Sequence, residues 1–235
     1  IVIFLFLNIY LYLEEGKDFI NNYKKVGKSG ILGGIGLGTA MITFIWSITH
    51  TTAAITLLTL AAMPFITALL GFLFLKEKIS PSVWISIIVA TLGISIMAYG
   101  TDSFGSIKGL LFGLASAVGF SIFSVSLRWR KETPKFTTVA IAGLFCFIFS
   151  LIILISKDMT FISPSKNQGL FALHGLIVCM GLILYSIGSK FLPAAELTLL
   201  SLTEVIGGIF WVWIPILGIN EIPSNSTIIG GFLIF

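Results

Sequence analysis

The sequence predicts an all-α membrane protein, a polytopic bundle whose helices cross the bilayer many times. Of the 235 residues, 57% are hydrophobic and only 10% are charged, and the mean hydropathy is +1.07. An average soluble domain has about 25% charged residues, so this chain has too few to cover a soluble core. Its apolar residues also form uninterrupted runs, and about 20 helical residues suffice to cross the hydrocarbon layer. Lipid is therefore the expected solvent.

By that length the sequence contains seven complete spans flanked by two partial ones. The runs are continuous and too long for the alternating strands of a β-barrel, whereas helices satisfy their own backbone hydrogen bonds in lipid. The expected spans are approximately residues 1–13, 30–48, 52–75, 80–99, 106–127, 136–156, 168–188, 193–217 and 225–235.

Local chemistry agrees with these boundaries. Ser80 is a good N-cap residue and Pro81 follows it at the first helical position, while Pro134 and Pro193 precede their own spans. Glycines at four-residue intervals should let neighbouring helices approach closely. These glycines are Gly30, Gly34 and Gly38 in one span and Gly109 and Gly113 in another.

Basic residues alternate between the two ends of the spans and predict the orientation. The chain has 14 Lys and Arg residues, and only Lys108, Lys157 and Lys166 fall on one face. Because basic loops favour the cytoplasm, the opposite face is expected to be cytoplasmic, in an inner or plasma membrane. The loops expected there are residues 14–29, 76–79, 128–135 and 189–192.

No cofactor, metal or nucleic-acid partner is expected from the sequence. Cys146 and Cys179 lie inside hydrophobic runs, without a CxxC pattern or a histidine at ligand spacing. The glycine-rich stretch ILGGIGLGTA lacks the preceding strand and the Lys-Ser/Thr ending of a phosphate-binding loop. The basic residues form short clusters rather than a continuous stripe with aromatic residues, so nucleic acid is not indicated.

The two halves of the chain resemble each other over short segments. TLLTL at residues 56–60 is echoed by TLLSL at residues 198–202, and Glu77 aligns with Glu221 in the turn that follows each span. Chance similarity between Leu/Thr-rich helices is the alternative explanation. Both echoes occupy the same place in the span pattern, but on opposite expected faces, which indicates an inverted repeat, an architecture common in secondary transporters.

The stretches AAMPFITALLGFLFLKEKISPSVWISIIVATLGI and LTEVIGGIFWVWIPILGINEIPSNSTIIGGFLIF resemble the paired helix-turn-helix signatures of EamA-type transporters. That family belongs to the drug/metabolite transporter superfamily. The resemblance implies ten helices in two inverted five-helix repeats with both termini cytoplasmic. The expected repeats here are residues 1–100 and 106–235, without the first helix and the end of the last.

The resemblance also implies roles for individual residues. Pro64 corresponds to the helix-breaking proline of the first signature, and Glu77 and Glu221 correspond to the two turn glutamates. Glu204 corresponds to the glutamate inside the second signature's helix. Family members often place proline directly after that glutamate, whereas Val205 follows it here, so a kink in the second half is expected to be shifted.

Glu204 is the leading candidate for a substrate-binding or proton-coupling residue. It lies about halfway along an apolar span, where an ionised side chain costs roughly 2.5 to 3.5 kcal/mol on insertion scales. Such a cost requires a partner, a cavity or a proton. A structural glutamate bonded to neighbouring hydroxyl or backbone groups is the alternative interpretation.

Three further residues are weaker candidates for the same cavity. Trp211 lies seven residues after Glu204 and therefore shares its helical face. Tyr185 could offer a hydroxyl, and His174 could titrate near neutral pH. Interfacial anchoring explains tryptophan equally well, and a hydrogen-bonded histidine is commoner than a proton relay.

The sequence favours a secondary carrier that exports a small polar metabolite, such as an amino acid or related compound, by alternating access. A membrane-embedded enzyme for lipid-linked substrates would need clustered Asp, His or Arg at a membrane face, and the sequence has none. A non-transporting helical scaffold is the third alternative. No enzymatic activity is expected, and the oligomeric state is not indicated.

Overall fold

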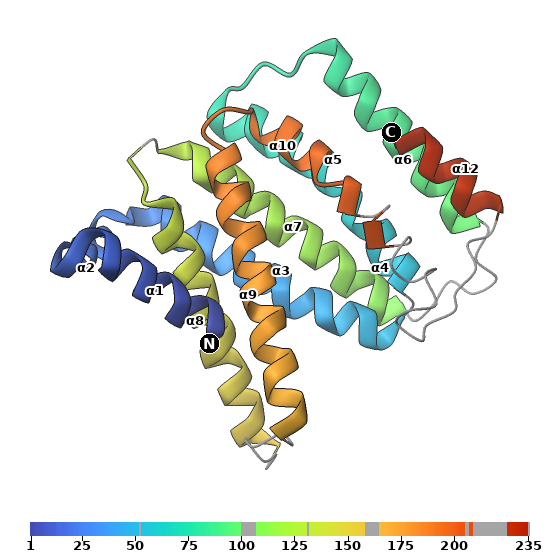
Figure 1. Ribbon diagram of the computed structural model, residues 1–235. Helices are drawn as coiled ribbons and strands as arrows, with labels where there is room; N and C mark the ends of the chain where they lie inside the picture. The colour runs from blue at the N-terminus through green and yellow to red at the C-terminus, as the bar shows by residue number, and fades with distance from the viewer. Residues whose placement is uncertain are drawn as a thin grey trace. The chain divides into compact units, whose positions relative to one another are not determined.

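The structure is a computed structural model of the chain, and every regular element that it describes is helical (Figure 1). It describes residues 1–51, 53–99, 107–130, 132–157, 165–204, 207–208 and 225–234. The long helices are α1 (Val2–Glu15), α3 (Gly27–His50), α6 (Pro81–Tyr99), α7 (Ile107–Trp129), α8 (Lys135–Ser156), α9 (Ser165–Gly188) and α12 (Asn225–Ile234). The shorter elements are η1 (Gly16–Asp18), α2 (Phe19–Lys25), α4 (Ala53–Leu60), α5 (Met63–Leu70), η2 (Gly71–Leu75) and α10 (Ala194–Leu200).

These helices follow the spans expected from hydropathy and confirm an all-α polytopic membrane protein. Within the described part of the chain, four helices are long and apolar enough to cross a membrane, namely α3, α7, α8 and the stretch Asn167–Gly188 of α9. Large apolar side chains such as Ile152, Ile155 and Leu184 are exposed on the outside of these helices. Such exposure suits a surface that faces lipid.

The chain forms two compact units, and each combines residues from both halves of the sequence. Unit 1 consists of residues 1–39 and 122–192, and unit 2 of residues 40–121 and 193–235. Helices α3 and α7 each contribute residues to both units. The division of the chain into repeats 1–100 and 106–235 stays a prediction from the sequence.

In unit 1, α1 packs against α8 and α9. The buried residues of α1 are Ile3, Leu7 and Leu11, whose spacing of four places them on one face of the helix. Gly143 of α8 allows a close approach, because a Cβ atom there would lie 2.9 Å from the backbone nitrogen of Phe4. The apolar stripe of α1 and a glycine of α8 therefore form one interface.

The glycines of α3 allow the close packing predicted from their four-residue spacing. A Cβ atom at Gly34 would lie 2.5 Å from Ile141, and one at Gly38 would lie 2.6 Å from Phe145. Both neighbours belong to α8. Any larger residue at these positions would push the two helices apart.

The side chains of Arg128 and Lys135 stabilise the segment at the end of α9 in unit 1. The Arg128 guanidinium donates to the backbone oxygens of Ser189 at 3.1 Å and Leu192 at 2.7 Å. The Lys135 ammonium donates to the Ser189 hydroxyl at 2.8 Å. Since carbonyls at a helix C-terminus lack intrahelical partners and carry partial negative charge, cations stabilise this end.

In unit 2, the span expected at residues 52–75 is broken into two helices by a turn at Ala61 and Ala62. Pro64 lies in the first turn of α5, where its missing N–H group is tolerated. The helix continues as the π-helical η2 and ends at Lys76, whose φ of 55° is in the left-handed region. The next helix, α6, starts after Ser80, whose hydroxyl accepts the Val83 N–H at 3.3 Å.

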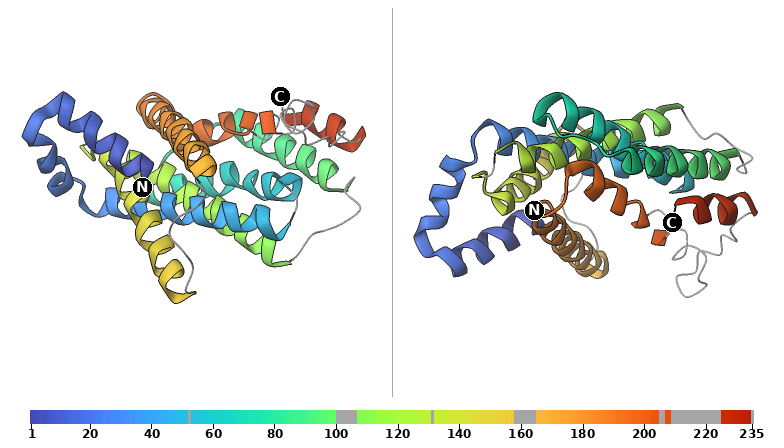
Figure 2. Two further views of the ribbon diagram at one scale, coloured as in Figure 1. Left: turned by 60° about the horizontal axis from the view of Figure 1, so that its bottom comes forward. Right: turned by 90° about the horizontal axis from the view of Figure 1, so that it is seen from above.

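The core of unit 2 joins segments that are far apart in sequence. One buried cluster contains Leu57, Leu60 and Met63 together with Ala117 of α7 and Leu202. Helix α10 packs on α5, and α12 lies along α6, as the views in Figures 1 and 2 show. The two segments that echo each other in sequence therefore belong to the same unit.

These two echoing segments run in opposite directions across each other. Ala68, late in the first span, packs in one cluster with Ala195 at the start of α10. Leu57, early in the first span, packs with Leu202, and a Cβ atom at Gly208 would lie 3.0 Å from its Cδ1 atom. Residues late in the first span therefore lie next to residues early in the second span, so the two spans are antiparallel.

Candidate functional site

Glu204 lies at the edge of a hollow in unit 2. The hollow has a volume of about 390 Å³. Its described lining comes from the end of α3, the start of α4 and the segment around Glu204, and consists of Phe44, Ile48, Ala53, Leu57, Glu204, Gly207 and Gly208. The Glu204 side chain is exposed, and it is the one charged group among these described lining residues.

The segment that carries Glu204 explains this exposure. Helix α10 ends at Leu200, and the Ser201 carbonyl then accepts the Glu204 N–H at 3.0 Å, in the tight spacing of a turn. Nothing lies within 4 Å of a Cβ atom built at Gly207. A helix that is interrupted before the carboxylate, followed by glycines, leaves open space beside it.

Next to the hollow's α3 and α4 walls, hydroxyl groups connect three helices. Ser47 Oγ lies 2.8 Å from Thr56 Oγ1 and donates to the Gly109 carbonyl at 2.8 Å. Ser116 Oγ donates to the Ala40 carbonyl at 2.9 Å, which joins α7 to α3 a second time. Buried hydroxyls that bond to backbone carbonyls hold helices together in a medium without water.

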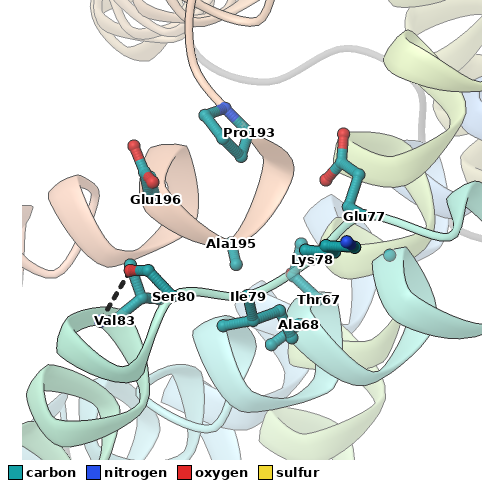
Figure 3. Close-up of a pocket in the computed structure, with 11 residues that line it drawn as sticks. Thr67, Ala68, Glu77, Lys78, Ile79, Ser80, Val83, Pro193, Ala195 and Glu196 are labelled. Carbon is teal, nitrogen blue, oxygen red and sulfur yellow. Dashed lines mark hydrogen bonds between the residues drawn. The ribbon is translucent and has the colours of Figure 1, made fainter.

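A second, smaller crevice of unit 2 surrounds Glu77, at the turn before α6 (Figure 3). Its volume is about 20 Å³, which is room for about one water molecule. The Glu77 side chain points toward the start of α10, and its Oε2 atom accepts the Ala194 N–H at 3.4 Å. Ala194 is the first residue of α10, so its N–H has no partner within the helix. Glu77 therefore caps a helix that is remote in sequence.

Thr67 lies beneath this crevice with its side chain fully buried. Its Oγ1 atom has no hydrogen-bond partner among the described residues. Glu196, in the first turn of α10, lines the same crevice and is half-buried. The crevice is thus narrow and lined by both polar and apolar residues.

Tyr185 and His174 belong to unit 1, on α9. The Tyr185 hydroxyl lies 2.6 Å from Ser124 Oγ, and its ring stacks on Phe123 with centroids 5.9 Å apart. His174 is exposed on α9. The structure gives Tyr185 a partner within its own unit and leaves His174 at the surface of its helix.

The remaining candidates fall outside the described residues. They are Trp211 and the turn glutamate Glu221. Across the residues that the structure describes, no group of three or more His, Cys, Asp and Glu side chains is placed to hold a metal ion.

Several residues of these sites could not be identified from sequence. Phe44, Ile48 and Leu57 read as ordinary core residues, and only folding brings them to Glu204. The sequence indicated only weakly that Ser47 and Ser116 bond to other helices, because serines inside apolar spans must find hydrogen-bond partners within the protein. The Glu77 contact with Ala194 joins residues 117 positions apart, which no local pattern reveals.

An interrupted helix beside a hollow in a bundle of apolar spans is typical of multi-pass membrane transporters. The sequence profile of the EamA-like transporter family matches residues 1–99. These residues therefore match an EamA-type domain, and over most of its length the chain is similar to proteins named as transporters.

Curated relatives are similar over most of this chain. The "Pseudopaline exporter CntI" of Pseudomonas aeruginosa (strain UCBPP-PA14) is 26% identical over 216 residues, which cover 87% of this chain and 70% of that protein. The "Uncharacterized transporter YdfC" of Bacillus subtilis (strain 168) is 27% identical over 185 residues, which cover 76% of this chain and 59% of that protein.

A solved crystal structure has the same fold. The TM-score is 0.71 at 19% sequence identity, and the match covers 99% of this chain and 81% of that chain.

Proposed function

We propose that this transporter is a secondary carrier that moves a small polar metabolite by alternating access, with the Glu204 hollow as its binding site. The observation that carries the proposal is the hollow itself, which places a carboxylate beside about 390 Å³ of space in unit 2. A charged side chain at membrane depth is costly and usually faces a cavity or a pathway. Glu204 fits that description better than a structural role does.

The opposite directions of the two echoing spans support an inverted repeat. Ala68 neighbours Ala195, whereas Leu57 neighbours Leu202, as expected for two related segments of opposite orientation. In secondary transporters such repeats exchange conformations, and that exchange opens the site to one side and then to the other. We assign the repeats to residues 1–100 and 106–235.

Contacts between loops support the proposed orientation, with loops 14–29, 76–79, 128–135 and 189–192 in the cytoplasm. In unit 1, Arg128 binds the carbonyls of Ser189 and Leu192, so two of these loops meet. In unit 2, Glu77 of loop 76–79 contacts Ala194, which follows loop 189–192. Loops that meet lie on the same side of a membrane, and basic loops favour the cytoplasm of an inner or plasma membrane.

The direction of transport that we propose is export. The Pseudomonas aeruginosa relative is named an exporter. A metabolite of the size of an amino acid or a related compound fits the volume of the hollow, which is at the lower end of the range of about 300 to 1,000 Å³ for ligand pockets.

Counterflow tests the carrier. Purified full-length protein in liposomes preloaded with each of a panel of unlabelled metabolites should accumulate the labelled solute transiently without ATP. Protein-free liposomes and the Glu204→Gln variant are the controls. A channel would equilibrate the label without overshoot, and a scaffold would not accumulate it, so either result would reject a carrier.

Labelling of single cysteines tests the orientation. The Arg130→Cys variant should react with an impermeant maleimide only from the cytoplasmic side. The Lys157→Cys variant should react only from the other side. Both positions are exposed. Labelling of both from one side would overturn the arrangement of spans.

A further inference from the structure

Resting on the proposed function, we propose that the Glu204 hollow takes a primary amine with a compact apolar body and no carboxylate of its own. The described walls of the hollow provide two kinds of surface. Glu204 supplies a negative charge, and Phe44, Ile48 and Leu57 supply apolar surface. A solute that matches both has a cationic end and an apolar end.

The charge of Glu204 has no basic counterpart on its own segment. From Phe191 to Phe235 the sequence contains no Lys, Arg or His, and residues 52–75 contain none either. On α3, Lys28 and His50 stand at the two ends of the helix. The His50 Nδ1 atom lies 2.7 Å from the Trp46 carbonyl, and its ring packs against Phe112.

A bound ammonium would supply a positive charge that none of the described lining residues carries. An ionised carboxylate in apolar surroundings is stabilised most by a cation within hydrogen-bonding distance, because the effective dielectric constant there is low. Phe44 adds an aromatic ring to the lining, and aromatic faces attract ammonium groups as well as apolar ones. An anionic solute would instead be repelled by Glu204.

The apolar walls argue against two other solute classes. A sugar needs many hydrogen bonds, and among the described lining residues only Glu204 has a polar side chain. A zwitterionic amino acid would bury its carboxylate next to Phe44, Ile48 and Leu57, none of which can bind it, and an unpaired buried charge is costly. The hollow therefore favours an amine over the amino acid of the same shape.

Three compounds that share a phenyl ring test this preference. Phenethylamine is a cation, phenylalanine adds a carboxylate, and phenylacetate is an anion. Binding to purified full-length protein in nanodiscs would be measured by isothermal titration calorimetry at pH 7. Phenethylamine should bind at least tenfold more tightly than phenylalanine, and phenylacetate should bind most weakly. Equal or tighter binding of phenylalanine or phenylacetate would overturn the proposal.

Variants connect the preference to the hollow. Glu204→Gln should weaken phenethylamine binding at least tenfold, Glu204→Asp should retain part of it, and the matched control Glu196→Gln should leave it unchanged. If Glu204→Gln does not fold, Gly207→Leu fills the hollow without removing the charge and should weaken binding by a similar factor. Unchanged binding in a folded variant of either residue would overturn the proposal.

Failure of this inference can be distinguished from failure of the carrier. Counterflow of another solute without a preference for amines would reject the substrate class and leave the carrier standing. Tight phenethylamine binding that depends on Glu204, with no counterflow of any solute, would reject the carrier and leave the binding site standing.

Discussion

Two glutamates of unit 2 occupy very different surroundings. Glu77 lies in a crevice of about 20 Å³, where its carboxylate accepts the first backbone N–H of α10. Glu204 lies beside a hollow of about 390 Å³ whose other described walls are apolar. A carboxylate that caps a helix is already stabilised by the protein, whereas one beside an apolar hollow gains most from a solute. The same residue type thus serves stability in one place and, as we propose, binding in the other.

The largest effect expected from this comparison is that of Glu204→Gln on solute binding. Hydrogen bonds to charged groups contribute about 1.5 to 3 kcal/mol, which corresponds to roughly 10- to 100-fold in affinity. Calorimetry with phenethylamine measures this loss of affinity. The thermal midpoint should remain within about 2 °C of the wild type, since a change of less than about 0.5 kcal/mol moves it no further. A large fall in the midpoint would assign Glu204 the structural role.

Gly207→Leu tests the same comparison, because it reduces the volume of the hollow without changing the charge of Glu204. Open space surrounds a Cβ atom at Gly207, so the leucine side chain can enter the hollow. We expect phenethylamine to lose roughly tenfold in affinity, or about 1.4 kcal/mol, while ethylamine, being smaller, loses less. Gly181→Leu on α9 is the matched control, because a Cβ atom there also has no neighbour. Equal losses for both amines would indicate that the hollow is not the binding site.

Glu77→Gln is expected to change stability and not binding. Glutamine keeps an oxygen that can accept the Ala194 N–H but loses the negative charge at the N-terminus of α10, which costs about 0.3 to 1 kcal/mol and lowers the thermal midpoint by roughly 1 to 4 °C for a chain of this size. Circular dichroism in detergent measures the midpoint. Lys78→Gln, at the exposed neighbouring position, should leave the midpoint unchanged. A loss of amine binding in folded Glu77→Gln would remove the distinction between the two glutamates.

The smallest effect should come from Thr67→Val. The Thr67 hydroxyl is buried without a partner among the described residues, and replacing such a group by a methyl of similar shape is nearly neutral or stabilising. The midpoint should stay the same or rise by about 1 to 2 °C. Ser47→Ala, which loses bonds to Thr56 and Gly109, should lower it. A fall with Thr67→Val would indicate that the hydroxyl binds a water molecule of the crevice.

The sequence was sufficient for the fold class and for most helix boundaries, because both depend on local properties. Continuous apolar runs predicted helices close to α6, α7 and α8, and the glycines of α3 predicted its close packing on α8. The length of each run and the prolines before it act within a few residues, so no tertiary information is needed.

The surroundings of the candidate residues could not be predicted in this way. Glu204 was identifiable because a carboxylate is rare in an apolar span, but Phe44 and Leu57 carry no sign that they would face it. Pro64 marked a break, yet only the fold shows that the break falls at Ala61 and Ala62. Pairings between distant segments depend on tertiary packing, which a single sequence does not encode in any local pattern.

The packing of α1 against α8 has a consequence for biosynthesis. Helix α1 packs against a helix that begins at Lys135, so the ribosome synthesises α1 long before this neighbour exists. Until α8 is made, the apolar face of α1 is exposed to lipid, and exposing apolar side chains to lipid has little free-energy cost. Unit 1 is therefore completed late in translation. Chains stalled before α8 should therefore expose α1 to lipid-phase cross-linkers.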